Sequence, residues 1–301
     1  MVVLAQFSDV HLGPLPQVSV ADLASKRVLG YLNWQRRRGR VHADSVLSAL
    51  IADMHAMRPD QIAVTGDLVN LGLPAEYRQA RIWLATLGAP HCVTVVPGNH
   101  DAYVASGIAH YTDQWRDFAN GDGRTGGQSG FPFLRRRGPL ALIGVSSAVP
   151  TGPFMATGRV GKAQTAALGS LLAEAGRDGL FRVVLIHHPV AEHAATRMRR
   201  LIDAARVRAA IAEHGAELVL HGHNHRTSVM AVPGPHGPVP VVGATATSLR
   251  PRPHHAGGGY NLFTIDGKPG AWAVTLRERA VTEAGTVETR LEQRLAVPGS
   301  G

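Results

Sequence analysis

Short apolar runs alternate with helical segments over the first two thirds of the chain. Val2 to Phe7 is predicted to form the first strand, and the helical spacing of apolar residues over 43–57 is followed by a second strand at 61–65. Strands that alternate with helices indicate βαβ connections and largely parallel sheets. The same alternation predicts further helices at 74–87, 111–118, 162–175 and 195–213, and further strands at 93–96, 140–145, 182–186 and 217–220.

The last third of the chain has a different pattern. Its apolar runs are short and are separated by Gly and Pro, as in a mixed or antiparallel sheet. They predict strands at 227–232, 239–246, 260–265 and 271–277. Because there is no internal repeat and no clear linker, we expect a single α/β domain over residues 1–296 with two sheets, followed by a disordered tail at 297–301.

A basic amphipathic segment at about 14–40 interrupts the alternation directly after the first strand. Apolar residues such as Leu23 and Leu29 are interleaved there with Lys and Arg, which predicts a basic amphipathic helix. Two interpretations stay open. The helix either packs its apolar face on the domain, or it serves as a substrate lid or a contact with an anionic membrane through residues 20–40.

The net charge of the 301-residue chain is +9, which raises the question of an anionic partner. Nearly all of its basic residues are Arg, as genome base composition alone can produce. A nucleic-acid partner is not expected, because no aromatic residues are interleaved with the charges to form a stacking groove. The run Arg135 to Arg137 is predicted to be a solvated loop.

The cellular location is predicted from weaker sequence signals than the fold. The longest apolar stretches are too short to cross a bilayer, which takes about 20 apolar residues. The first residues form a predicted strand rather than a signal peptide, and the single cysteine, Cys92, excludes an internal disulfide framework. We therefore expect a cytoplasmic protein, with a peripheral membrane association as the alternative.

Polar side chains of the types that bind metals follow five of the predicted strands. The carboxyl ends of parallel strands meet at one edge of a sheet, so these side chains are expected to lie close together. Each motif alone has a plain structural explanation, such as a capping Asp, a turn Asn or a core His. Seven mixed carboxylate, amide and imidazole donors exceed one tetrahedral site and suit two cations such as Mn, Fe, Co or Zn. The donors are Asp9, His11, Asp67, Asn99, His187, His223 and His225.

The order of these motifs resembles that of the calcineurin-like metallophosphoesterase superfamily. The blocks are Asp9-Val-His11, Gly66-Asp67, Gly98-Asn-His-Asp101, His187 and Gly222-His-Asn-His225. The resemblance implies a four-layer αββα sandwich of two mixed sheets flanked by helices, with a dinuclear centre at the strand ends. It implies one metal on Asp9, His11 and His225, a second on Asn99, His187 and His223, and Asp67 as the bridge.

The resemblance also implies roles for residues beside the ligands. Two cations about 3.5 to 4 Å apart lower the pKa of a bridging water and neutralise the phosphoryl oxygens during in-line attack by the resulting hydroxide. His100 is the candidate for stabilising the developing charge or protonating the leaving oxygen, with Asp101 orienting its ring. Asn70 and His188 are candidate substrate-binding residues, and His188 could instead support the ligands.

The motifs indicate the substrate less clearly than they indicate the metal centre. His11 and His100 make the chain most similar to small bacterial phosphodiesterases that act on cyclic nucleotides or glycerophosphodiesters. The alternative is a membrane-surface pyrophosphohydrolase of a lipid-linked substrate such as UDP-2,3-diacylglucosamine. A non-catalytic metal-binding scaffold is a third hypothesis, which the complete ligand set disfavours. Homodimerisation through residues 14–40 or the C-terminal strands is a further open alternative.

Overall fold

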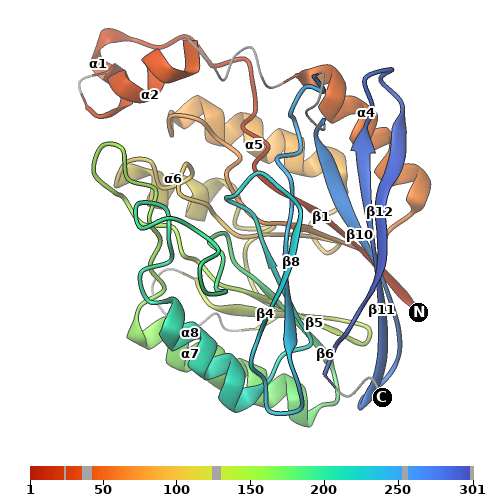
Figure 1. Ribbon diagram of the computed structural model, residues 1–301. Coiled ribbons are helices and arrows are strands. Elements are labelled where there is room, and N and C mark those ends of the chain that lie inside the picture. The colour runs from red at the N-terminus through yellow and green to blue at the C-terminus, as the bar shows by residue number, and fades with distance from the viewer. Residues whose placement is uncertain (24, 36–42, 124–129, 253–256, 299–301) are drawn as a thin grey trace.

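The fold is a sandwich of two six-stranded mixed sheets with helices on both outer faces (Figure 1). The computed structural model describes residues 1–301 except 24, 36–42, 124–129, 253–256 and 299–301. The helices α4 to α6 cover one sheet and α7 and α8 cover the other, which makes four layers in the order αββα. The fold class predicted from the sequence is confirmed.

The first sheet has the strand order β12-β11-β10-β1-β2-β3. Its parallel part consists of β1 (Val2–Phe7), β2 (Gln61–Val64) and β3 (Val93–Val95). The connections run through α4 (Asp44–Met57) and α5 (Pro74–Leu87), and α6 (Ser106–Gln114) follows β3. The strands β10 (Gly259–Lys268), β11 (Ala271–Val281) and β12 (Val287–Leu295) extend the sheet in antiparallel fashion.

The second sheet has the strand order β4-β5-β6-β7-β9-β8. The parallel strands are β5 (Leu140–Gly144), β6 (Phe181–Leu185), β7 (Leu218–His221) and β9 (Val239–Gly243). The edges are the antiparallel strands β4 (Phe133–Arg137) and β8 (Ser228–Val232). The helices α7 (Lys162–Arg177) and α8 (Ala204–His214) pack on its outer face.

The central strands read as continuous apolar runs because both of their faces are buried. In β6, Val183 and Leu185 belong to the core cluster shared with the first sheet, whereas Val184 belongs to the cluster under α7 and α8. This is the alternation of side chains expected of a strand that lies between two layers.

Several boundaries differ from the sequence prediction. The helix expected at 195–213 begins only at Ala204, because the Asp203 carboxylate accepts hydrogen bonds from the backbone N–H groups of Val160 (3.0 Å) and Gly161 (2.7 Å). These contacts tie the preceding residues to a neighbouring loop. The helix expected at 111–118 spans 106–114, and the edge strands β4 and β12 were not predicted. At the C-terminus Val297 packs in the core, whereas 299–301 lie outside the described residues, so the disordered tail stays a prediction.

The prediction of a solvated loop at Arg135 to Arg137 is wrong. These residues form part of β4, and Arg135 is 2% exposed. Its guanidinium donates to the carbonyls of Pro90 and Val93 (both 2.7 Å) and thereby ties the loop around β3 to the second sheet. A buried Arg that satisfies backbone carbonyls is a structural residue, not part of a nucleic-acid track.

The segment at 14–40 forms two short helices rather than one amphipathic helix. They are α1 (Val20–Leu23) and α2 (Arg27–Asn33), and they stand outside the two sheets and their covering helices (Figure 1). The Arg-rich end at 36–40 lies outside the described residues. Among the helices that the structure describes, none has the length and apolar content that a membrane span requires.

Candidate metal centre

All seven predicted donors lie in the loops that follow strand ends. Five of them have left-handed backbone angles, which non-glycine residues adopt rarely and at a cost of about 1–3 kcal/mol each. Such strain persists only where surrounding contacts hold it, and it is concentrated at functional sites. The five are Asp9 (φ 50°), His11 (45°), Asp67 (58°), His223 (69°) and His225 (56°).

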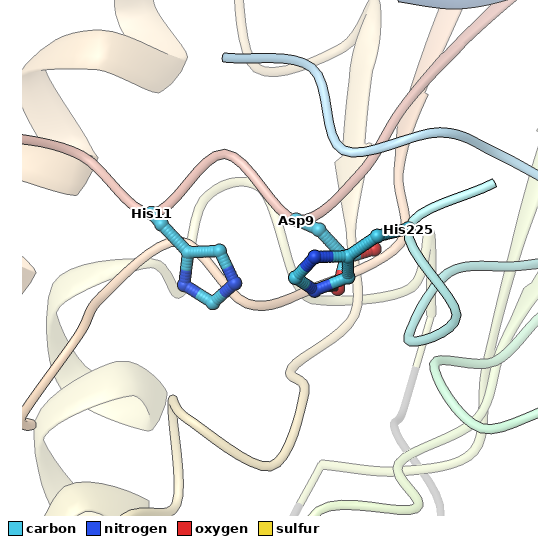
Figure 2. Close-up of side chains that lie close together, drawn as sticks. All are labelled: Asp9, His11 and His225. Atoms are coloured by element: carbon cyan, nitrogen blue, oxygen red, sulfur yellow. Dashed lines mark ion pairs between the residues drawn. The ribbon is translucent and has the colours of Figure 1, made fainter. Parts of the chain in front are cut away.

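One set of donors consists of Asp9, His11 and His225. Their potential ligand atoms all lie within 4.8 Å of one another. His225 Nε2 is 3.1 Å from Asp9 Oδ1, and the ring of His11 lies beside this pair (Figure 2). Asp9 and His11 come from the loop after β1 and His225 from the loop after β7, so residues from both sheets form this set.

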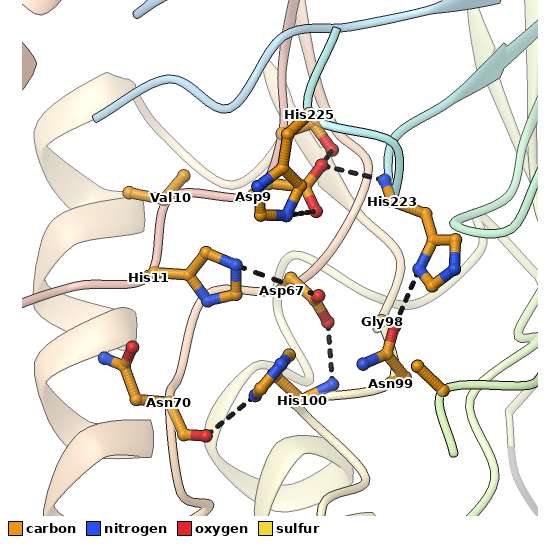
Figure 3. A network of polar contacts seen from close by, with 12 residues as sticks. Asp9, Val10, His11, Asp67, Asn70, Gly98, Asn99, His100, His223 and His225 are labelled. Atoms are coloured by element: carbon orange, nitrogen blue, oxygen red, sulfur yellow. Dashed lines mark hydrogen bonds and ion pairs between the residues drawn. The ribbon is translucent and has the colours of Figure 1, made fainter. Parts of the chain in front are cut away.

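A second set consists of Asn99, His187 and His223. Asn99 Oδ1 is 2.9 Å from His223 Nδ1 and 3.2 Å from His187 Nε2. Asp67 lies between the two sets (Figure 3), since its Oδ2 is 3.4 Å from His187 Nε2 and 4.0 Å from His11 Nε2. One carboxylate therefore reaches both groups of donors.

Backbone carbonyls orient two of the imidazoles. His187 Nδ1 lies 2.7 Å from the carbonyl oxygen of Thr65, and His11 Nδ1 lies 3.3 Å from that of Val69. A neutral ring that donates from Nδ1 keeps the lone pair of Nε2 for the centre, as metal-binding histidines require.

Buried atoms of the centre lack a hydrogen bond among the described residues. They include His223 Nε2 and Asp9 Oδ1, and the latter forms an ion pair with His225. A buried polar atom without a hydrogen bond costs about 1–3 kcal/mol, and a cation would remove that cost. The residues present therefore fit two divalent cations, and their mixed oxygen and nitrogen donors suit Mn, Fe, Co or Zn.

The electrostatics of the chain itself point the same way. Burial raises the pKa of the Asp67 carboxyl, but the neighbouring His187 and His100 outweigh it and hold this pKa well below its usual range. Burial lowers the pKa of His187, but Asp67 raises it to about 9 overall. Burial lowers the pKa of His223 to about 3, which keeps this ring neutral and able to bind a metal. Without a cation, the buried Asp67 carboxylate thus takes its positive charge mainly from His187.

The expected pairing of Asp101 with the His100 ring is corrected by the structure. The fully buried Asp101 carboxylate accepts hydrogen bonds from four backbone N–H groups, those of Asp67 (2.8 Å), Leu68 (2.9 Å), Val69 (3.1 Å) and Gly98 (2.8 Å). The ring of His100 instead meets the carbonyl oxygen of Asn70 through Nδ1, at 2.7 Å. Asp101 therefore joins the loops after β2 and β3 and sets the position of Asp67.

The two candidate substrate-binding residues differ in position. Asn70 lines the pocket beside the centre, and its side-chain Nδ2 donates to the carbonyl of Leu12 (2.8 Å). His188 is fully buried, with Ser147 Oγ 2.7 Å from Nδ1 and Ala156 O 3.2 Å from Nε2. Its ring packs on that of His223, with centroids 4.4 Å apart. These contacts favour the alternative that His188 supports a ligand.

A pocket of about 610 Å³ opens beside the centre, and sequence reasoning identified few of the residues that line it. Asn99 and His100 form its end at the centre, while α2 and the loop at 151–156 form the other walls. Tyr103, whose ring stacks on His100 at 5.6 Å, was also missed. In the sequence, the one indication of this pocket was that the segment at 14–40 departs from the βαβ pattern.

Comparison with known proteins agrees with this geometry. Over 44 residues, 15% of each chain, the sequence is 50% identical to a glycerophosphodiester phosphodiesterase of Enterobacter lignolyticus, so the match spans a small part of that relative. A probable cyclic nucleotide phosphodiesterase of Synechococcus is 24% identical over 250 residues, 82% of this chain and 81% of that one.

The fold is shared with a dimetal phosphatase from Danio rerio, with a TM-score of 0.59, 13% identity, and coverage of 96% of this chain and 98% of that one. The family model described as calcineurin-like phosphoesterase matches residues 2–227. This range contains every donor of the candidate centre. The predicted class, a metal-dependent hydrolase of phosphoester bonds, is confirmed at the level of the family, and the chain belongs to the calcineurin-like phosphoesterases.

Proposed function

We propose that the chain hydrolyses small phosphodiesters with two divalent cations bound at the candidate centre. In this proposal Asp9, His11 and His225 hold one cation, and Asn99, His187 and His223 hold the other. Asp67 bridges them. The observation that carries the proposal is the position of Asp67 Oδ2, 3.4 Å from His187 Nε2 and 4.0 Å from His11 Nε2, because one carboxylate there contacts both ligand sets.

Bound at this centre, the two cations would supply Lewis-acid stabilisation of the phosphoryl group and activation of the attacking water. The identity of the metals among Mn, Fe, Zn and Co stays a prediction. The chain itself keeps the ligand atoms aligned through the backbone contacts of His11 and His187 described above.

His100 is proposed to act on the leaving group. A ring nitrogen of His100 lies within 4.8 Å of ligand atoms of His11 and Asp67, and the residue also lines the pocket. Its backbone N–H donates to Asp67 Oδ1 at 2.7 Å. From this position the imidazolium stabilises developing negative charge or donates a proton to the leaving oxygen. Asn70, rather than Asp101, is proposed to orient its ring.

A phosphodiester is favoured over other phosphoesters because the two similar relatives described above carry the names of phosphodiesterases. The second candidate is a lipid-linked pyrophosphate cleaved at a membrane surface. The exposed apolar residues of α2 favour it, whereas Lys26 and Arg27 bond to carbonyls of the same chain. A cytoplasmic location, a membrane contact through 20–40 and a homodimer stay predictions.

The test is hydrolysis of bis(p-nitrophenyl) phosphate by the Mn-loaded protein, with Asn99→Ala as the blank. A UDP-linked diacyl sugar in detergent micelles is assayed in parallel. Preference for the soluble diester is expected, and preference for the lipid would establish the second candidate. A purified chain that binds transition metal but hydrolyses neither substrate would contradict both and support the hypothesis of a metal-binding scaffold.

A further inference from the structure

The outer part of the pocket is built from apolar side chains, which we call the roof. The roof consists of Leu29 and Leu32 of α2 together with Pro153, Phe154 and Met155. Asn99 and His100 line the same pocket at its other end. A substituent on a phosphoryl group held at the centre would therefore extend toward the roof, since the two share one cavity.

The helix α2 is attached to the domain by its basic residues. Lys26 Nζ donates to the carbonyl of Thr151 at 2.6 Å and lies 4.4 Å from the ring centroid of Tyr103. Arg27 donates to the carbonyls of Leu71 (3.1 Å) and Gly72 (2.6 Å). These contacts fix the roof relative to the centre.

The apolar side chains of α2 are left partly exposed. None of its residues is buried, and Leu29 and Leu32 are 40% and 41% exposed. A surface helix normally buries its apolar face and keeps its charges in water. In α2 this arrangement is reversed. Leu29 and Leu32, three residues apart along the helix, form a partly exposed apolar face that lines the pocket.

Phe154, from the loop at 151–156, lines the same pocket as this face. Its side chain is 86% exposed, and its backbone has a φ of 61°, which is an outlier for a bulky residue. Neighbouring Met155 is 40% exposed. Backbone strain of this kind is concentrated at ligand-binding sites. An exposed phenyl side chain on a strained backbone therefore indicates a contact with a ligand.

We infer that the roof binds an alkyl or acyl chain carried by the phosphoester, so that the enzyme selects amphiphilic substrates. This rests on the proposed function. Most of the roof is aliphatic or thioether, and the ring of Tyr103 is already in contact with His100 and Lys26. Although Phe154 and Trp34 also line the pocket, the other four residues of the roof offer no aromatic face, so an extended chain contacts more of this surface than a flat base does.

The test is a series of alkyl p-nitrophenyl phosphates from methyl to octyl, each below its micelle concentration, with the Mn-loaded enzyme. We expect kcat/KM to rise about twofold to fourfold for each methylene until the roof is covered. Leu32→Ser and Phe154→Ser are expected to flatten this rise. Ile82→Ser, a change of equal polarity at a 68% exposed position of α5, is the matched control and keeps the full slope.

A flat series in the unmodified enzyme would overturn the inference while leaving the proposed function intact. A preference of tenfold or more for the phenyl ester over the hexyl ester would also overturn it, in favour of an aromatic substituent. If the enzyme hydrolyses no member of the series, the proposed function fails instead. Calorimetric binding of octyl phosphate and methyl phosphate then tests the roof alone, and equal affinities for the two would refute it.

Discussion

The floor and the roof of the pocket are built on opposite principles. The floor is the candidate centre, where five of the seven polar donors are buried and five have left-handed backbone angles. The roof is α2 with the loop at 151–156, where apolar side chains are exposed and basic residues fasten the structure. Each region thus departs from the usual partition between core and surface, with polar donors buried in the floor and apolar side chains exposed in the roof.

This difference assigns catalysis to the floor and choice of substrate to the roof. Buried donors with carbonyl and N–H partners keep a fixed geometry, which chemistry at a phosphoryl group requires. Exposed apolar residues on short helices depend on a few contacts and lose water only when a ligand covers them. Changes in the floor should therefore affect turnover and metal content, whereas changes in the roof should affect the choice of substrate.

The largest effect is expected from Asp67→Ala, which removes the proposed bridge. Both cations should be lost and kcat/KM should fall on the order of 10⁴-fold or more, because ligand sets of this kind act as a unit. Metal analysis measures the loss of cations, and steady-state kinetics measure the fall in kcat/KM. Asp117→Asn, at an exposed carboxylate paired with Arg81, is the control and should change neither. A metal-replete Asp67→Ala protein would contradict the assignment.

His100→Ala should separate chemistry from metal binding within the floor. Because His100 is proposed to act on the leaving group, kcat should fall about 10² to 10⁴-fold while both metals stay bound. His91→Ala, at an exposed position, serves as the comparison. Full turnover by the His100 variant would show that another group acts on the leaving oxygen.

Asp101→Asn tests how the floor is held together. The amide nitrogen replaces one oxygen that accepts two backbone N–H groups, and we expect a loss of about 2–4 kcal/mol in the free energy of unfolding, with weaker metal binding. Urea denaturation of the metal-free protein measures it. Asp113→Asn, at an exposed site, should stay within about 0.5 kcal/mol of the parent. An effect on kcat alone would instead support the original pairing with His100.

Removal of metal tests the floor without mutation. At a free Mn²⁺ concentration 100 times the dissociation constant, each site stabilises the folded state by about 2.7 kcal/mol, so dialysis against chelator should lower Tm by several degrees. Asn99→Ala should show a smaller difference between the metal-free and metal-loaded states. Identical Tm values with and without Mn²⁺ would argue against a preformed site.

The smallest effect is expected for Lys26→Met, at the N-cap of the helix α2 that carries part of the roof. Losing the hydrogen bond to Thr151 O loosens α2, and KM for an octyl ester should rise about threefold to tenfold, with a smaller change in kcat. Lys162→Met, at an exposed position at the start of α7, is the control. A large loss of kcat would mean that the roof also positions His100 through Tyr103.

Much of the floor could be predicted because its signals are local. A strand buried on both faces reads as a continuous apolar run, and a donor directly after it must lie at the carboxyl edge of the sheet. The α2 segment was predicted only in part, because its amphipathic pattern was compatible with either orientation on the domain. The burial of Arg135 was missed entirely, since its carbonyl partners come from residues distant in sequence such as Pro90.

The sequence by itself determined the order of the motifs, the strand–loop sites that carry them and the chemical character of the donors, since these depend on residue type and local propensity. Only the tertiary structure decided that Asn70 rather than Asp101 holds the His100 ring, that α2 turns Arg27 inward, and that Arg135 is buried. Each of these depends on contacts between distant segments. Local propensity does not encode such contacts, because they form only when the two sheets pack together.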